Sequence, residues 1–193
     1  MTLLKQLFRQ WYWIAGGSIT VLLLSTVSGI LIGSYTPTIA SAPSLPSTCL
    51  PQNLPGIRNP ASELKLKQVS STRYQGKEYR LYDVTRPATP MPFPYVVQIQ
   101  GASCKGIYSN PMGDPDDYFH LAMPLPVARQ LTLGRLQAAI QQAGGLPAFR
   151  DRLQRSQQQY GGVTQMAEEE VWAYQQMGLA LPDNVRVVKA TTR

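Results

Sequence analysis

A long stretch without charged side chains constrains this chain more than any other feature. No Asp, Glu, Lys or Arg occurs between Arg9 and Arg58, and residues 11–33 are mostly apolar. A helix over residues 11–33 rises about 1.5 Å per residue and is about 35 Å long, enough to cross a hydrocarbon core of about 30 Å. The sequence therefore predicts a transmembrane helix over residues 11–34, which argues against a wholly cytoplasmic globular protein.

The residues on either side of this helix predict its orientation. Lys5 and Arg9 precede it without a balancing acid, so the positive-inside rule keeps residues 1–10 in the cytoplasm as a short tail. Aromatic residues that serve as membrane-interface anchors stand at both ends of the run: Trp11, Tyr12, Trp13 and Tyr35. We therefore expect a single-pass membrane protein whose C-terminal domain lies outside the cytoplasm.

Cleavage of this segment as a signal peptide is the alternative. Ala40-Ser41-Ala42 has the small residues of a cleavage site, and the segment begins with basic residues. The apolar run is longer than the about 7–15 residues usual in a signal peptide. An uncleaved signal-anchor helix is therefore the favoured interpretation.

Ser25, Gly29 and Gly33 recur every four residues on one face of the expected helix. Small residues at this spacing let a second helix approach closely. A single match of this kind also arises by chance, because glycine is common in membrane helices. We expect this face to contact a partner helix, either in a homodimer or in a membrane protein complex.

Residues 35–61 predict a Pro/Ser-rich linker, and residues 62–193 predict the extracytoplasmic domain. The linker carries prolines interleaved with Ser and Thr, which favours an extended spacer over a packed element. In the domain, strands are predicted at 64–70, 79–85, 95–99 and 104–108, with Gln75-Gly76 in the first turn.

Helical patterns follow these strands. They predict a helix from Pro126 to Gly144-Gly145, a second from Pro147 to about Gln159, and a third from a Thr164 cap to Gly178, with a last strand at 185–189. Strands followed by helices indicate an α+β domain. We expect an N-terminal single transmembrane helix, then an antiparallel β-meander followed by about three helices.

Cys49 and Cys104 are the two cysteines of the chain. Their separation excludes a C-x-x-C redox motif, and the predicted orientation places both in a compartment where disulfides form. A structural disulfide that pins the linker to the sheet is the favoured interpretation, and two free thiols are the alternative.

The residues that could carry chemistry have simpler structural explanations. His120 could act as a base with Asp116 or Asp117, but no recognisable arrangement accompanies it, and a partly exposed structural histidine is expected. The acidic segment 110–117 could hold calcium, yet its two prolines favour a solvated turn. Glu168, Glu169 and Glu170 suit the start of a helix, and consecutive carboxylates point in different directions. We expect no metal, no cofactor and no enzymatic activity.

Trp172 stands apart on the third predicted helix. The apolar stripe of that helix contains Ala167, Val171 and Tyr174, and Trp172 lies more than about 100° from its centre. Its neighbours on that polar face are Gln165, Glu168, Glu169 and Gln176. A tryptophan in this position is typical of a partner contact. A helix covered on two sides within the domain is the alternative.

The charge balance bears on partners. The 18 Lys and Arg and 11 Asp and Glu of the whole chain give +7, and excluding Lys5 and Arg9 leaves 16 against 11, or +5. A basic domain beside a membrane can meet anionic lipid headgroups or an acidic protein surface. Nucleic acid is not an expected partner in this compartment. The excess of Gln over Asn and of Arg over Lys resembles the composition of single-pass cyanobacterial membrane proteins, which implies a periplasm or a thylakoid lumen.

These observations lead to one functional hypothesis and one alternative. The hypothesis is a single-pass membrane-anchored protein whose extracytoplasmic domain binds proteins, as a non-catalytic accessory or assembly subunit of a membrane complex. The alternative is a module that binds a small ligand or a lipid headgroup, tethered or released after cleavage.

Overall fold

The computed structural model describes residues 49, 63–87, 89–114, 116–160 and 164–190 of the chain. The predicted tail (1–10), transmembrane helix (11–34) and, apart from Cys49, linker (35–61) lie outside these residues. No helix in the described ranges is long and apolar enough to cross a membrane.

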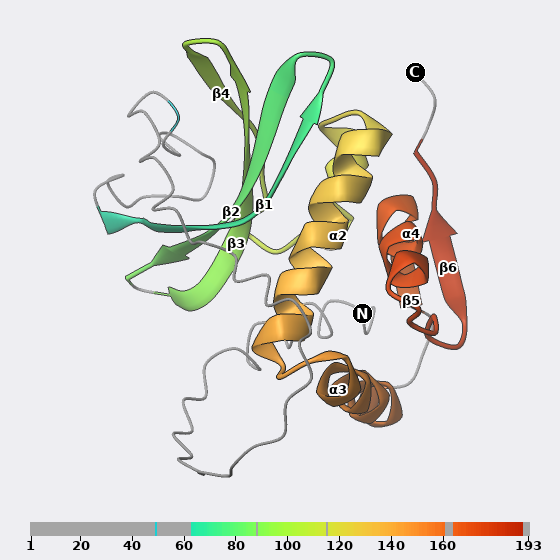
Figure 1. Ribbon diagram of the computed structural model, residues 1–193. Helices are drawn as coiled ribbons and strands as arrows, with labels where there is room; N and C mark the ends of the chain where they lie inside the picture. Colours follow the sequence, from blue (N-terminus) through green and yellow to red (C-terminus); the bar gives the residue numbers. More distant parts are fainter. Residues whose placement is uncertain (1–48, 50–62, 88, 115, 161–163, 191–193) are drawn as a thin grey trace, which may run out of the picture.

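The N-terminal half of the domain is a four-stranded antiparallel sheet with strand order β1-β2-β3-β4 (Figure 1). The strands are β1 (Lys65–Tyr74), β2 (Lys77–Arg86), β3 (Thr89–Gln100) and β4 (Ser103–Ser109). Gln75 and Gly76 both have positive φ, as a tight two-residue hairpin turn requires. The predicted antiparallel meander is therefore confirmed.

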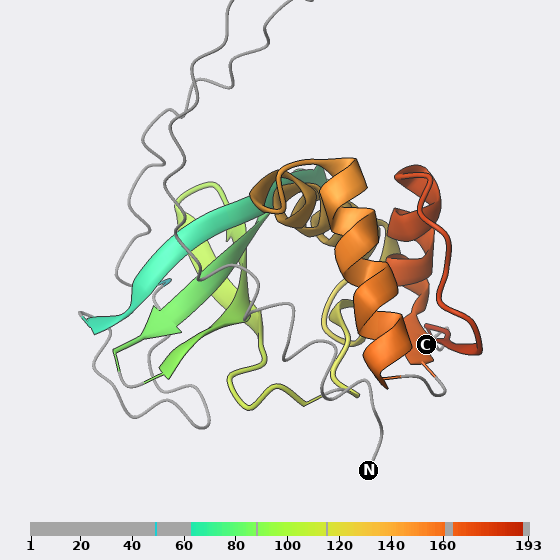
Figure 2. The same ribbon diagram turned by 90° about the horizontal axis from the view of Figure 1, so that it is seen from below.

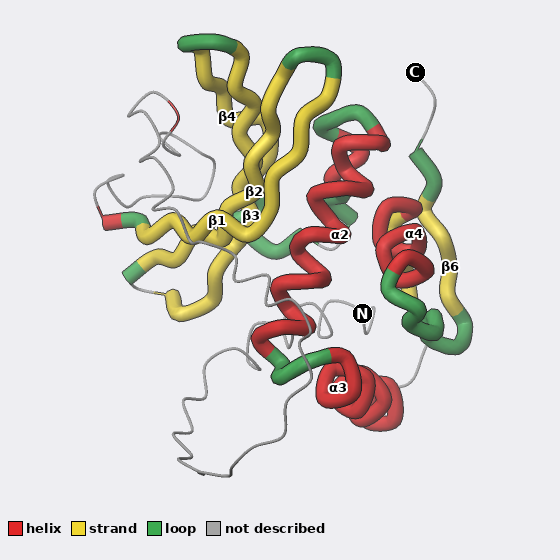
Figure 3. The backbone as a smooth tube through the Cα atoms, in the orientation of Figure 1, coloured by secondary structure: helices red, strands yellow, loops and turns green. Residues whose placement is uncertain are grey.

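Three α-helices and a short 3-10 helix follow the sheet (Figure 3). They are η3 (Phe119–Leu121), α2 (Leu125–Gln142), α3 (Leu146–Tyr160) and α4 (Glu168–Gln176). The α+β class and the three helices agree with the sequence-based prediction.

The prediction that the third helix starts with a cap at Thr164 is wrong. Residues Thr164–Ala167 form a strand, β5, which pairs in parallel with β6 (Val185–Val188). Thr164 donates its backbone N–H to the carbonyl of Asn184, so it belongs to a sheet and does not cap a helix. The helix begins at Glu168, after Ala167.

Helix α2 lies between the sheet and the C-terminal elements (Figures 1 and 2). One side of α2 packs on one face of the sheet, in a buried cluster formed by Tyr79, Leu81, Val96, Tyr108, Phe119, Met123, Val127, Ala128 and Leu131. The other side of α2 packs with α3 and α4 in a second cluster, formed by Leu136, Ile140, Ala143, Phe149, Met166, Ala173, Tyr174 and Leu179. Val127 and Leu131 of α2 lie in the first cluster, and Phe149 of α3 lies in the second.

The opposite face of the sheet is buried as well. Its cluster contains Cys49, Leu64, Tyr82, Val84, Phe93, Tyr95 and Val97. Cys49 comes from the predicted linker, so a residue that precedes the domain in sequence is part of the domain's core.

Candidate functional site

A disulfide joins the predicted linker to the sheet. Cys49 and Cys104 are bonded across a separation of 55 residues, with Cα atoms 5.5 Å apart. Cys49 is fully buried, and Cys104 is the second residue of β4. The structure thus contains the bridge that the cysteine count and the predicted compartment favour.

Tyr95 strengthens the same attachment. Its hydroxyl donates a 2.9 Å hydrogen bond to the backbone carbonyl of Cys49. Burial raises the pKa of this phenol, which keeps the hydroxyl protonated and able to donate. The Tyr95 ring reaches this position over Gly106 of β4, where a Cβ atom would overlap the hydroxyl. Cys49, Tyr95, Cys104 and Gly106 together form what we term the tether clamp.

The first turn of α4 carries a second polar site, the carboxylate cluster of Glu168, Glu169 and Glu170. Each carboxylate has a different partner, as expected for consecutive helical residues. Glu168 forms a 2.5 Å ion pair with Arg129 of α2. Glu170 accepts a 2.8 Å hydrogen bond from the backbone N–H of Ala167.

Glu169 pairs with the single histidine. Its Oε2 lies 2.6 Å from Nδ1 of His120, and its Oε1 accepts the backbone N–H of His120 at 3.1 Å. Both side chains are only 2% exposed. His120 is a structural histidine, as expected, but its side chain is more deeply buried than the expected partial exposure, and it pairs with Glu169 and not with the Asp116 or Asp117 of the catalytic alternative. The partner is a glutamate 49 residues further along the chain, on a helix face that looks polar in the sequence.

The geometry of this pair limits its chemistry. Both carboxylate oxygens of Glu169 are used within the pair, one at Nδ1 and one at the backbone N–H of His120. Nε2 is buried and has no hydrogen-bond partner among the described residues. Because the His120 and Glu169 side chains are each only 2% exposed, the pair lies inside the fold, where it connects η3 to α4.

An aromatic ring lies against the His120 side chain of the pair. The Tyr118 ring stacks on the His120 ring with centroids 5.6 Å apart. Burial, together with nearby carboxylates led by Glu170, raises the pKa of Tyr118 to about 12. Burial also raises the pKa of Tyr174, with a further contribution from Glu170.

Glu170 carries a carboxyl group whose pKa is strongly raised. Burial raises the pKa of its carboxyl to about 7, against the lowering effect of the Ala167 N–H. Glu169 raises this pKa further, and Arg135 of α2 lowers it. Glu170 therefore changes its protonation state near neutral pH.

The acidic segment 110–117 satisfies its own polar groups. The Asn110 side chain accepts the N–H of Asp114 and donates to its carbonyl, both at 2.7 Å. Asp116 donates its N–H to the Asp114 carboxylate at 3.0 Å. Burial, with repulsion from Asp114, raises the pKa of Asp117. No group of three or more metal-binding side chains is found in the described ranges.

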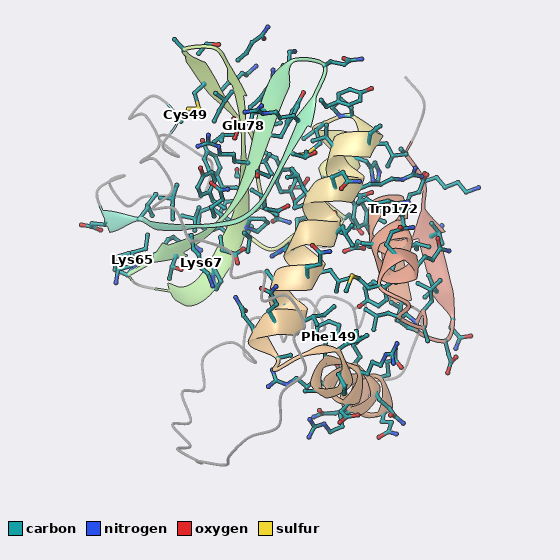
Figure 4. All side chains as sticks on the ribbon, viewed as in Figure 1. Cys49, Lys65, Lys67, Glu78, Phe149 and Trp172 are labelled. Carbon is teal, nitrogen blue, oxygen red and sulfur yellow. A yellow bond between two sulfur atoms is a disulfide. The ribbon has the colours of Figure 1, made fainter. Side chains whose placement is uncertain are left out.

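Trp172 is partly buried in the structure. It packs against the second cluster and is labelled on α4 in Figure 4. The polar neighbours predicted for Trp172 differ in exposure: Glu169 is buried, whereas Gln176 is exposed. The buried part of the Trp172 side chain therefore packs within the domain.

The remaining predicted site residues lie outside the described residues. These are the interface anchors Trp11, Tyr12, Trp13 and Tyr35 and the helix-contact residues Ser25, Gly29 and Gly33. In contrast, the structure adds residues that the sequence did not single out, namely Tyr95, Gly106 and Arg129, and it gives Glu169 a partner.

Comparisons with protein-family models, with curated proteins and with solved structures find no match to this chain.

Proposed function

We propose that this chain is a membrane-anchored, non-catalytic accessory or assembly subunit of a membrane complex. In this proposal the transmembrane helix at 11–34 holds the α+β domain outside the cytoplasm, in a periplasm or thylakoid lumen. The domain then binds other proteins of the complex at the membrane surface.

The tether clamp is the observation that carries this proposal. A disulfide and a buried hydrogen bond fix Cys49 to the sheet, directly after the segment expected to lead from the membrane. A domain that works at a set distance from a membrane benefits from such an attachment, whereas a freely diffusing protein gains only stability from it. A stable disulfide also suits an oxidising compartment.

The state of His120 supports a non-catalytic role. A general base must lie within hydrogen-bond reach of its substrate. The His120 side chain is instead buried with Glu169 and joins two elements of the fold. The exposed part of Trp172 is our candidate for the partner contact, since aromatic residues dominate the energetics of protein interfaces.

Purification of the tagged full-length chain from native membranes in mild detergent tests the proposal. We expect stoichiometric membrane-protein partners and an intact mass that includes the N-terminal segment. A variant with Gly29→Ile and Gly33→Ile should lose partners that bind through the transmembrane helix, and Val21→Ile is the matched control. A lone chain processed after Ala42 would contradict the proposal and favour a ligand-binding module.

A further inference from the structure

The two ends of the sheet carry different charges. We term the end formed by the β1–β2 and β3–β4 turns, residues 73–78 and 99–105, the turn end. Register places Arg73 opposite Glu78, Glu78 opposite Ile99, and Ile99 opposite Cys104.

Basic side chains are in excess at the turn end. Arg73 and Lys105 are exposed there and Lys77 is partly exposed. The acidic residue of this end, Glu78, already forms a 2.6 Å ion pair with Arg80. Hydrogen bonding to Arg80 lowers the pKa of Glu78, with a smaller contribution from Arg73. Arg73, Lys77 and Lys105 therefore present a net positive surface.

The far end of the sheet is mixed in charge. Lys65 and Lys67 lie there, with Lys67 opposite Asp83 of β2. The loop after β4 adds the exposed Asp114 and Asp116. Figure 4 shows the separation, with Cys49 and Glu78 near one end of the sheet and Lys65 and Lys67 near the other.

The tether clamp attaches at the turn end. Cys104 lies beside the β3–β4 turn, so the disulfide fixes Cys49 at this end of the sheet. Thirteen residues, 36–48, separate Cys49 from the expected membrane anchor Tyr35. Fully extended they span about 45 Å at most. In the proposed anchored arrangement the tether enters the domain at the turn end, and its length lets that end face the bilayer.

We propose that the turn end of the sheet, through Arg73, Lys77 and Lys105, docks on anionic lipid headgroups. This inference rests on the proposed membrane anchor and adds the face and the lipid chemistry. The three side chains project from both faces of the sheet, because Arg73 shares a face with Cys104 whereas Lys77 and Lys105 lie on the face of Tyr79. End-on approach brings all three to one plane of phosphates. Each basic residue at an anionic surface favours binding about fivefold, and the attraction weakens over a Debye length.

Fluorescence quenching on the full-length chain in nanodiscs tests this docking. A fluorescent amino acid replaces Ala102, in the β3–β4 turn, and the discs contain a lipid with a nitroxide on its headgroup. Discs of phosphatidylcholine alone are compared with discs that contain phosphatidylglycerol. In a second protein the probe replaces Met112, which is 79% exposed. Met112 marks the far end of the sheet, because the carbonyl of the neighbouring Pro111 accepts a hydrogen bond from Arg86 there.

We expect phosphatidylglycerol to raise quenching at Ala102 and leave quenching at Met112 unchanged, and we expect high salt to remove the difference. The triple variant Arg73→Gln, Lys77→Gln, Lys105→Gln should shift the docking equilibrium about 100-fold toward the undocked state. The matched triple variant Lys65→Gln, Lys67→Gln, Arg186→Gln loses the same charge and should behave as the wild type. Equal responses at both probes, or equal responses of the two triple variants, would overturn the docking proposal.

Failure of the anchor can be distinguished from failure of the docking. A chain that does not incorporate into discs contradicts the proposed function. The same chain can then be sedimented with phosphatidylglycerol vesicles, where loss of binding in the first triple variant alone supports the turn end as the lipid surface. A chain that incorporates but shows no lipid-dependent quenching at Ala102 contradicts the docking alone.

Discussion

Glu169 holds His120 with both of its carboxylate oxygens, one on the ring Nδ1 and one on the backbone N–H. The two residues belong to α4 and η3, which are separated by the whole of α2 and α3. The pair therefore fixes the C-terminal elements to the segment that leaves the sheet.

Replacing Glu169 should cost much more stability than replacing its neighbour. We expect Glu169→Ala to lower the free energy of unfolding by about 3 kcal/mol, because the backbone N–H and Nδ1 of His120 would stay buried without their partner. Glu168→Ala removes a partly exposed ion pair with Arg129 and should cost less than about 1 kcal/mol. Urea denaturation of the two variants measures the difference, and equal costs would show that the His120 pair contributes little.

Glu170 should make stability depend on pH. Its native pKa of about 7 lies above its ordinary value of 4.5, so the native state binds more protons than the unfolded state between these values. Stability from this group is therefore full below about pH 4.5 and is lost as pH rises through 7. Glu170→Gln keeps an oxygen for the Ala167 N–H and removes the titration. We expect the variant to be more stable than the wild type by about 3 kcal/mol at pH 8 and nearly equal to it at pH 4.5. Denaturation curves with the same pH slope in both proteins would contradict this expectation.

The hydroxyl of Tyr95 should matter for the tether clamp. Tyr95→Phe leaves the buried carbonyl of Cys49 without its donor and should cost about 1–2 kcal/mol. Gly106→Ala should cost at least as much, because its Cβ displaces the same hydroxyl. Tyr74→Phe is the matched control, since the Tyr74 hydroxyl makes only an exposed 3.5 Å contact. Thermal denaturation in detergent ranks the three variants, and a Tyr95→Phe protein as stable as the control would argue against the clamp.

Reduction of the disulfide should destabilise the domain strongly. Closing a loop of 55 residues removes chain entropy from the unfolded state, which corresponds to about 4 kcal/mol. Urea midpoints with and without dithiothreitol measure this effect on the full-length chain. The variant Cys49→Ser, Cys104→Ser should match the reduced wild type and show no further change with the reductant.

Gly134 should tolerate no side chain, although it lies inside a helix. Alanine normally stabilises an exposed helix interior by about 1 kcal/mol relative to glycine. Here a Cβ would overlap the side chain of Ser70 on β1, and such overpacking costs about 1–3 kcal/mol. We expect Gly134→Ala to destabilise the protein. The loss of stability should be smaller when Ser70 is replaced by Gly as well, because the overlapping side chain is then absent. The exposed Gln137→Ala on the same helix is the control and should be neutral or slightly stabilising.

The sequence predicts the parts of this fold that have a regular pattern. Tyr95-Val96-Val97-Gln98-Ile99 is rich in β-branched residues and lies in the second half of β3. The 3.6-residue spacing of Val127, Leu131 and other apolar residues predicts α2, and these side chains are buried. Two cysteines in a disulfide-permissive compartment leave a single possible intramolecular pair.

The remaining features depend on contacts between distant residues. In the sequence, Glu169 lies on the polar face of its helix, and no basic residue nearby offers it a partner. Its partner in the structure is His120, which lies on another element. Residues Thr164–Ala167 form only four residues of strand, and the strand exists because Val185–Val188 returns beside it. The role of Gly106 depends on the Tyr95 ring from the neighbouring strand. A single-sequence pattern contains none of these relationships.

The parallel pairing of β5 and β6 makes the C-terminal unit dependent on its neighbour. Parallel pairs are slightly less stable per residue than antiparallel ones, and two strands alone bury too little apolar surface to stay folded in water. The unit of β5, α4 and β6 therefore owes its stability to the surface of α2, through the second cluster and the His120–Glu169 pair. In hydrogen-exchange terms, residues 164–188 should open together at a lower free energy than the central strands of the sheet. Any protein that binds α2 and α4 at once would suppress this opening, so protection of these amides would report binding at the C-terminal elements.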